Sequence, residues 1–159
     1  MSNELVRTTS TIGESNLHLQ ITPAYRQDVF VNPQVEELVR IFVYDKLKQL
    51  KILVLAEDCG PDHWHFFLAN WKNYSISKIA QYVKGYSSYM IRKLYPELIN
   101  DKLWGKKFWS EGYFYRTVGV VTKETVKRYV EETQGKHWNV LSQEQYVKQK
   151  RQMSLLSFN

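Results

Sequence analysis

The chain has 159 residues, which is the usual size of one compact domain. Hydrophobic residues make up 43% and charged residues 24%, a composition that excludes wholesale disorder. Cys59 is the single cysteine, so no intrachain disulfide can form, and no apolar run is long enough to span a membrane. The polar N-terminus lacks the apolar core of a signal peptide, and we expect a cytoplasmic protein with no membrane partner.

Basic and aromatic side chains are the marked feature of the composition. There are 22 Lys and Arg against 16 Asp and Glu, a net charge of +6, and aromatic residues reach 14%. Cations neutralise phosphates and rings stack on bases, so this combination suits a nucleic acid partner. A solvated basic surface with no partner explains the charge equally well.

The first elements in the chain are an arm, a strand and a helix. Residues 1–15 are rich in Ser, Thr and Asn, and we expect a flexible N-terminal arm. In the segment NLHLQI, alternation places Leu17, Leu19 and Ile21 on one face of a strand. Apolar residues at helical spacing then predict an amphipathic helix over 33–50.

A hairpin and a second helix are predicted next. KILVLAED (51–58) and HWHFFLAN (63–70) have strand composition, and the turn CGPD joins them. Ser75 or Ser77 can cap the helix that follows, and Pro96 ends it.

The last third begins with loosely alternating residues. Residues 103–120 predict one bent strand, since the alternation is interrupted by glycines. Thr122 can cap a last helix that Gly135 ends. We therefore divide the chain into the arm, a domain over 16–135 and a basic C-terminal tail over 136–159.

The element order is strand, helix, strand, strand, helix, strand, helix. The first six elements match the split βαβ arrangement of ferredoxin-like domains, an α+β fold with helices on one face of a four-stranded antiparallel sheet. The last helix is additional. This fold hosts many functions, so the function has to be argued from particular residues.

The triplet His63-Trp64-His65 is the clearest candidate site. Residues i and i+2 of a strand point to the same side, so both imidazoles can converge on one ion while Trp64 faces the other way. Two half-exposed histidines without a ligand are the alternative. We expect Asp62 to serve chiefly as a turn residue, although its carboxylate can also fix a histidine ring.

Tyr129 lies on the predicted last helix. Arg128 beside it can face a phosphate backbone, and Glu132 and Thr133 share its helix face. Gln134 is turned away from that face in a regular helix. A tyrosine on a solvated helix is no sign of catalysis by itself.

Several segments together resemble the single-tyrosine HUH transposases, small insertion-sequence enzymes that act on single-stranded DNA. GPDHWHFFLANW resembles their histidine strand, and HLQITPAYRQDVF is similar to their first strand. YSISKIAQYVKGYSSYMIRKLYPEL resembles their second helix, with its Lys-Gly and Ser-rich centre. LWGKKFWSEGYFYRTVGVVTKETVKRYVEETQ resembles their final strand and tyrosine helix. The likeness runs from about residue 17 to 135, with the motifs in the right order.

The resemblance implies a role for each central residue. His63 and His65 would bind a divalent metal, Mg²⁺ or Mn²⁺, and imidazole ligands favour the latter. Tyr129 would be the nucleophile that forms a 5′-phosphotyrosine. Trp64 is bulkier than the residue that usually separates the two histidines.

The third metal ligand departs from the family pattern. The family usually has Gln four residues after the tyrosine, where this chain has Thr133. Gln134 follows one residue later. Unwinding of the helix end near the next glycine would turn its side chain toward the helix face of Tyr129. We expect Gln134 to be the ligand, with Glu132 as the alternative.

The resemblance also implies the substrate and the assembly. The function would be transposition, by cleaving and rejoining single-stranded DNA at hairpin-bearing element ends. A homodimer is expected, in which the tyrosine helix of one subunit completes the site of the other. Basic residues that by analogy can contact the DNA are Lys84, Arg92, Lys93, Lys106, Lys107 and Arg128.

Three alternatives remain at this point. A domesticated relative would process repeated hairpins in its host genome with the same residues. A non-catalytic module would bind RNA or single strands by stacking bases on Tyr113, Phe114 and Tyr115. A structural zinc protein is disfavoured because the chain lacks the four-ligand Cys/His set of a closed zinc site.

Overall fold

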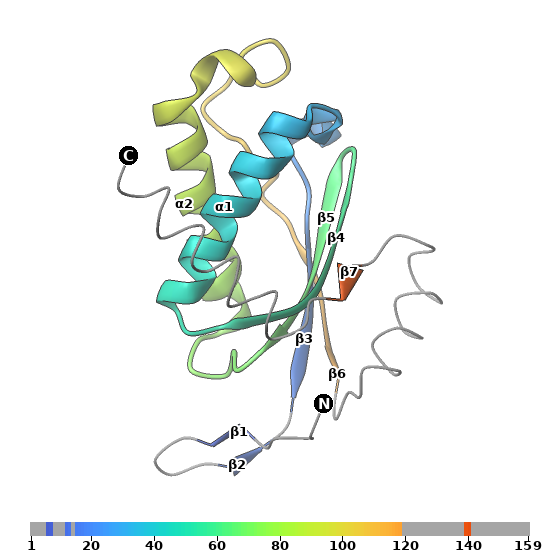
Figure 1. Ribbon diagram of the computed structural model, residues 1–159, viewed down its shortest axis with the longest axis vertical. Helices are drawn as coiled ribbons and strands as arrows, with labels where there is room; N and C mark the ends of the chain where they lie inside the picture. The colour runs from blue at the N-terminus through green and yellow to red at the C-terminus, as the bar shows by residue number, and fades with distance from the viewer. Residues whose placement is uncertain (1–5, 8–11, 14, 119–138, 141–159) are drawn as a thin grey trace.

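In the computed structural model, an antiparallel sheet carries two helices on one face (Figure 1). The structure describes residues 6–7, 12–13, 15–118 and 139–140. Over these residues the strand order of the main sheet is β6-β3-β5-β4-β7. Its strands are β3 (Asn16–Ile21), β4 (Leu53–Gly60), β5 (His63–Ala69), β6 (Phe114–Val118) and β7 (Asn139–Val140).

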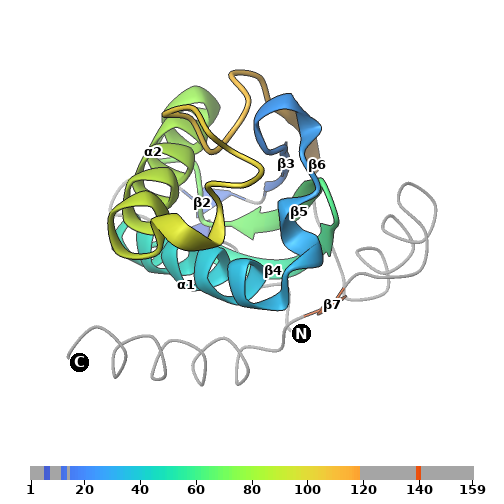
Figure 2. The same ribbon diagram turned by 90° about the horizontal axis from the view of Figure 1, so that it is seen from above.

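The predicted ferredoxin-like arrangement is confirmed. β3 lies between β5 and β6, β4 pairs with β5, and every pairing is antiparallel. Viewed from above, both helices lie on the same side of the sheet (Figure 2). The C-terminal helix predicted between Thr122 and Gly135 lies outside the described residues.

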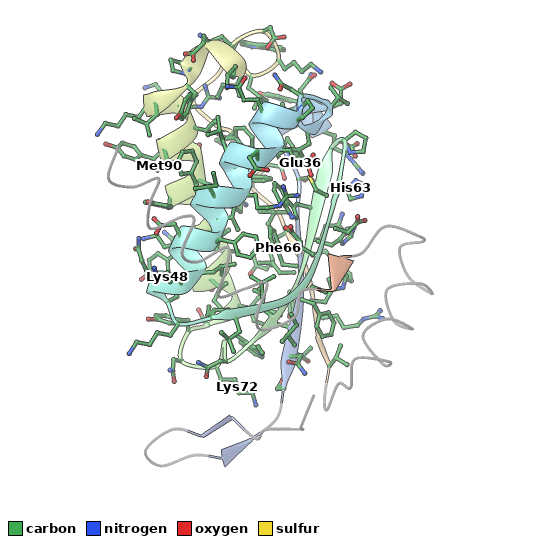
Figure 3. All side chains as sticks on the ribbon, in the orientation of Figure 1. Glu36, Lys48, His63, Phe66, Lys72 and Met90 are labelled. Atoms are coloured by element: carbon green, nitrogen blue, oxygen red, sulfur yellow. The ribbon has the colours of Figure 1, made fainter. Side chains whose placement is uncertain are left out.

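Strand alternation divides the sheet into two faces. Leu17 and Leu19 of β3, and Trp64 and Phe66 of β5, are at most 1% exposed and join the core beneath the helices. Figure 3 shows Phe66 pointing from the sheet toward the helices. The intervening positions therefore point to the opposite face, where His18 of β3 lies.

Both predicted helices are present, and each has an N-cap side chain. α1 covers Pro33–Gln49, and the Asn32 side chain accepts a hydrogen bond from the Gln34 amide at 3.0 Å. α2 covers Ile76–Leu94, and Ser75 is its N-cap. Pro96 follows the helix, as predicted, and begins the short 3-10 helix η3 (Pro96–Leu98).

The prediction of one bent strand over 103–120 is wrong for most of its length. Over the described part of this range, residues 103–118, only β6 (Phe114–Val118) forms a ladder, and before it Trp109 makes an isolated bridge with Pro23. Side chains from α2 bind the backbone carbonyls of this segment instead. Arg92 donates to Leu103 O at 3.3 Å and to Lys107 O at 2.6 Å. These side-chain donors take the place of the backbone N–H groups that a neighbouring strand would supply.

The β4–β5 connection is tighter than predicted. β4 continues to Gly60, which pairs with His63, so only Pro61 and Asp62 remain in the turn. Two short 3-10 helices, η1 (Ala24–Arg26) and η2 (Val29–Val31), follow β3. Arg26, the last residue of η1, contacts Asp62 in the β4–β5 turn, so η1 lies close to this turn.

The ends of the chain contribute short strands. β1 (Val6–Arg7) pairs with β2 (Ile12–Gly13) in the predicted arm. β7 belongs to the predicted tail and pairs with β4, an edge pairing that the sequence did not predict. Where the structure describes the chain, no helix is both long and apolar enough to cross a membrane.

Candidate functional site

His63 and His65 lie on the sheet face opposite the helices. Their spacing on β5 turns both rings to one side, as predicted, and the ring centroids are 5.0 Å apart. His63 begins the strand beside the β4–β5 turn (Figure 3). Its side chain is 26% exposed, whereas His65 is 1% exposed.

His18 orients the ring of His65. Its Nε2 lies 3.1 Å from Nδ1 of His65, across the β3–β5 pairing. Burial and the positive charge of Arg116 lower the pKa of His18 to about 4, so His18 is neutral near neutral pH. A neutral His18 can accept at Nε2, and His65 then carries its proton on Nδ1 and a lone pair on Nε2.

Asp62 orients the ring of His63. One carboxylate oxygen lies 2.8 Å from Nδ1 of His63, and the other accepts from Nε of Arg26 at 3.3 Å. The hydrogen bond to His63, followed by that to Arg26, holds the pKa of Asp62 below its usual value. Asp62 is thus a turn residue, as expected, and also a partner of the histidine.

Gly60 makes room for the His63 ring. A Cβ at this position would lie 2.3 Å from Cε1 and 2.6 Å from Nε2 of His63. Real Cβ atoms do not approach other atoms so closely. The close approach of Gly60 therefore sets the position of the ring above β4.

The two histidines have the arrangement expected of metal ligands. Metal-binding histidines engage the second ring nitrogen with a protein partner, and here both Nδ1 atoms have one. The Nε2 atoms would therefore face the ion. Among the described side chains, no group of three or more His, Cys, Asp or Glu could hold a metal. The candidate third ligands Gln134 and Glu132 lie outside the described residues, and their roles stay a prediction.

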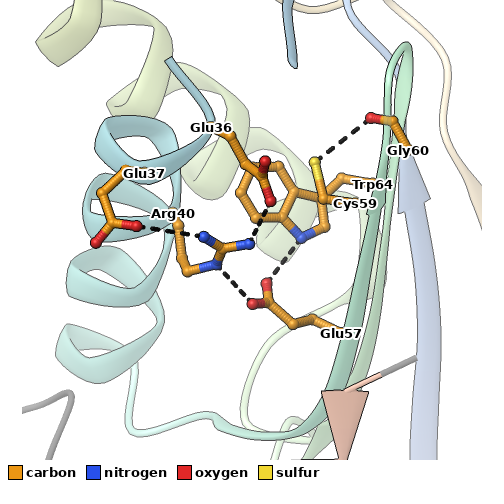
Figure 4. Close-up of polar contacts among 7 residues, drawn as sticks. All are labelled: Glu36, Glu37, Arg40, Glu57, Cys59, Gly60 and Trp64. Carbon is orange, nitrogen blue, oxygen red and sulfur yellow. Dashed lines mark hydrogen bonds and ion pairs between the residues drawn. The ribbon is translucent and has the colours of Figure 1, made fainter. Parts of the chain in front are cut away.

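A buried polar cluster anchors β5 from the helix side (Figure 4). Trp64 Nε1 donates to one oxygen of Glu57 at 2.8 Å, and Arg40 Nε donates to the other at 2.6 Å. Arg40 also binds Glu36 at 2.7 Å, and its guanidinium lies 5.2 Å from the Trp64 ring centroid. Glu57 thus supplies the hydrogen-bond acceptor for the indole N–H of Trp64, the bulky middle residue of the histidine triplet.

Burial sets the electrostatics of this cluster. Desolvation raises the pKa of Glu57, and the charge of Arg40 offsets part of that shift. Burial opposes the charge on Arg40, but the carboxylates of Glu57 and Glu36 outweigh it and raise the arginine pKa. The ion pair is therefore interdependent, because each charge is tolerated only with its partner present.

Two of the predicted DNA-binding residues bind backbone carbonyls of the protein itself. Lys84 donates to Glu111 O at 2.9 Å and to Gly112 O at 3.2 Å, and Arg92 binds two carbonyls of the same irregular segment. Both side chains thus hold the segment 103–112 against α2. Any DNA contact by either residue stays a prediction.

The remaining predicted contacts are more exposed. Lys93 lies over the Tyr89 ring at 5.3 Å, Lys107 pairs with Glu111, and Lys106 is exposed. Arg128 and the predicted nucleophile Tyr129 lie outside the described residues.

The aromatic residues of the stacking alternative are accessible. Tyr113, Phe114 and Tyr115 are 36%, 47% and 53% exposed. The Phe114 ring meets His18 edge-on, with the centroids 5.7 Å apart. Phe114 therefore borders the histidine face, whereas the next residue of β6, Tyr115, points to the other face of the sheet. The exposure of the three rings is compatible with base stacking.

Comparison with known proteins identifies the family of this chain. A family model described as "Transposase IS200 like" matches residues 11–133. The chain is therefore a member of the IS200-like transposase family, which implies DNA cleavage and strand transfer.

Curated relatives agree with this assignment. The ISDra2 transposase TnpA of Deinococcus radiodurans is 29% identical over 114 residues, covering 72% of this chain and 80% of the relative. The transposase for insertion sequence element IS200 of Salmonella typhimurium is 30% identical over 119 residues, covering 72% and 76%.

Solved structures share the fold. A crystal structure from Deinococcus radiodurans, assigned as a transposase, has a TM-score of 0.63 at 23% identity and covers 80% of this chain and 97% of that one. A REP-associated tyrosine transposase bound to a REP hairpin has a TM-score of 0.54 at 10% identity, covering 79% and 68%. At these identities the likeness concerns the fold alone.

Proposed function

We propose that this transposase cleaves and rejoins single-stranded DNA at hairpin-bearing element ends, with Tyr129 as the nucleophile and a divalent metal on His63 and His65. The observation that carries the proposal is the arrangement of the two histidines, each with Nδ1 engaged by a protein partner. We assign the role of metal ligand to the Nε2 atoms, because both rings lie on one face of β5.

The metal would be Mg²⁺ or Mn²⁺. When bound, it polarises the scissile phosphate and offsets the charge that grows on the phosphate oxygens. Nε2 of His63 and Nε2 of His65 are the proposed ligating atoms, and Gln134 is the proposed third ligand, with Glu132 as its substitute. His18 and Asp62 hold the two rings in the required tautomer and orientation.

Tyr129 carries the covalent step. Its hydroxyl oxygen attacks the phosphorus and loses its proton to solvent or a base, while the bond from phosphorus to the 3′-oxygen breaks. The 3′-oxygen leaves and takes up a proton. The product is a 5′-phosphotyrosine, which conserves the phosphodiester bond energy, so a 3′-hydroxyl of another strand can reverse the step without ATP.

The substrate and assembly are carried over from relatives. One structural neighbour is bound to a hairpin, and the family resemblance supports hairpin recognition and a homodimer with shared active sites. A cytoplasmic location fits a DNA-processing enzyme. A domesticated, repeat-processing role would use the same residues, and palindromes flanking the gene would distinguish the two roles.

A non-catalytic module for single-stranded nucleic acid is the second candidate. The exposed rings of Tyr113, Phe114 and Tyr115 favour it, since accessible aromatic residues on a sheet can stack bases. This alternative predicts that neither Tyr129 nor a metal affects function.

An adduct assay distinguishes the two candidates. Labelled single-stranded DNA carrying hairpins from the gene flanks would be incubated with the protein and Mn²⁺ or Mg²⁺, and run on a denaturing gel. We expect a metal-dependent protein–DNA adduct that Tyr129→Phe and His63→Ala abolish. Tyr82→Phe is the matched control and should retain the adduct. Binding of these strands without an adduct under either metal would replace the catalytic proposal with the binding module.

A further inference from the structure

A hollow of about 510 Å³ lies between η1 and the segment before β6. Its lining includes Tyr25, Trp104 and Trp109. Tyr25 and Trp104 are 82% and 74% exposed, yet their rings are nearly parallel, with an interplanar angle of 7° and centroids 6.2 Å apart. Large apolar rings so exposed and so aligned offer a flat surface to a planar ligand.

The backbone that presents Tyr25 is strained. Tyr25 and Arg26 have φ angles of 56° and 49°, in the left-handed region that residues with a Cβ rarely occupy. Neighbouring contacts hold this conformation: the Ala24 amide donates to Phe108 O at 2.8 Å, and the Arg26 side chain binds Asp62. Strain held in this way tends to occur where a side chain must be presented for function.

Trp104 is equally well supported. The preceding residue, Leu103, is 2% exposed, and its amide donates to Ile99 O at 2.7 Å. Arg92 binds the Leu103 carbonyl at 3.3 Å. The backbone that carries each ring is therefore held by hydrogen bonds. Less conformational entropy of the protein is then lost when a ligand binds to the rings.

The hollow is connected to the histidine site through the residue that follows Tyr25. Arg26 donates to Asp62, and Asp62 contacts Nδ1 of His63 at 2.8 Å. The backbone that presents Tyr25 is therefore linked to the turn that orients His63.

Three lysines and one glutamate line the rim of the hollow: Lys102, Lys106, Lys107 and Glu111. Lys102 pairs with Asp28 and Lys107 pairs with Glu111, whereas Lys106 is exposed at the rim. Lysine ammonium groups attract phosphates, whereas the flat rings suit a base. The combination fits a nucleotide of a single strand better than an apolar peptide, which would not use the charges.

We propose that Tyr25 and Trp104 form a stacking platform for one unpaired base of the DNA strand, next to the scissile phosphate. The assignment of that strand as substrate rests on the function proposed above. The platform would hold the strand by stacking, without reading its sequence, and would help to place the phosphate over His63 and His65.

The test compares two probes that differ only in their bases. One is a fluorescein-labelled oligodeoxythymidylate of ~20 nucleotides, longer than the usual single-strand site. The other is an abasic oligomer of equal length and charge. Affinities would be measured by anisotropy on the full chain in the Tyr129→Phe background with EDTA, so that binding is separated from metal-dependent cleavage.

We expect Trp104→Leu and Tyr25→Leu to weaken oligodeoxythymidylate binding by about 5- to 140-fold, the range for losing one stacked base. Binding of the abasic oligomer should change little, because the phosphate contacts remain. Trp104→Phe keeps a ring and should retain most of the affinity. Tyr89→Leu, an exposed aromatic of α2, is the matched control and should bind like the parent.

Two results would overturn the platform. One is equal affinity of the parent for both probes, and the other is an equal loss on both probes in Trp104→Leu with its folding intact by circular dichroism. Either result leaves the transposase proposal to be judged separately, because adduct formation with wild-type protein and Mn²⁺ is an independent measurement.

Discussion

His18 Nε2 lies 3.1 Å from His65 Nδ1, so a histidine of β3 engages one ring nitrogen of His65. The two residues are 47 positions apart in the chain and meet through the β3–β5 pairing. This contact, with that between Asp62 and His63, turns two strand histidines into an ordered pair of potential ligands.

Replacing His18 tests its positioning role. We expect His18→Phe to weaken Mn²⁺ binding by about 10- to 100-fold, the effect of losing the partner of a metal-binding histidine. His18→Gln keeps an acceptor oxygen and should restore part of the affinity. Free Mn²⁺ would be measured by electron paramagnetic resonance during titration. Wild-type affinity in a folded His18→Phe variant would argue against the role.

Gly60→Ala tests whether the ring position of His63 depends on the glycine. The added Cβ would lie 2.3 Å from the ring, so the ring must move away from its place above β4. We expect Mn²⁺ affinity to fall by about 10-fold or more. The free energy of unfolding should change by less than ~1 kcal/mol, since the partly exposed ring can swing outward.

Gly112→Ala is the matched control for that variant. A Cβ at Gly112 meets nothing within 4 Å. Mn²⁺ titration should give wild-type affinity for Gly112→Ala. Equal affinities for both alanine variants would show that Gly60 does not determine the position of the ligand.

Arg40→Met tests the buried cluster behind the histidine strand. The change leaves the Glu57 carboxylate buried without its cation, and we expect a loss of about 3 kcal/mol in the free energy of unfolding. Adding Glu57→Gln removes the uncompensated charge, and the new amide oxygen can still accept from Trp64. Urea denaturation should therefore find the double variant within ~1 kcal/mol of wild type. A double variant no more stable than Arg40→Met would contradict this assignment.

The same variant should acquire a pH dependence. Without Arg40, Glu57 loses the charge and the hydrogen bond that most lower its pKa, while burial still raises it, so its folded pKa moves further above the unfolded value. The folded state then binds more protons than the unfolded state, so stability is lost as the pH rises above the usual glutamate pKa of about 4.3. Urea denaturation between about pH 4 and 7 should show this slope for Arg40→Met, and Glu57→Gln should remove it.

The third ligand can be identified by Mn²⁺ titration of single variants. We expect Gln134→Ala to weaken binding by about 10-fold or more, whereas Glu132→Ala should bind like wild type. Thr133→Ala, at the family's usual ligand position, serves as the control. The reverse result would assign the ligand oxygen to Glu132.

Local patterns predicted most of the fold. The helices at 33–49 and 76–94 were found because capping residues and apolar spacing act within a few residues. The same-side placement of His63 and His65 follows from strand geometry alone. These features need no knowledge of the partners of each element.

Features that depend on strand register or on distant side chains were missed. The roles of His18 and Arg40 require knowing which strands and helices pack together, although alternation in NLHLQI already places His18 opposite the core residues Leu17 and Leu19. Loose alternation over residues 103–120 predicts a strand before β6 as well. Lys84 and Arg92 bind its carbonyls in place of a neighbouring strand.

The most direct test of the central claim is the chemical identity of the DNA attachment. The adduct formed with hairpin DNA and Mn²⁺ would be trimmed with nuclease and protease, and the modified peptide sequenced by mass spectrometry. We predict a 5′-phosphonucleotide on Tyr129, absent from His63→Ala and His65→Ala protein. Attachment to another residue, or an adduct that persists in both histidine variants, would contradict the proposed metal-assisted tyrosine mechanism.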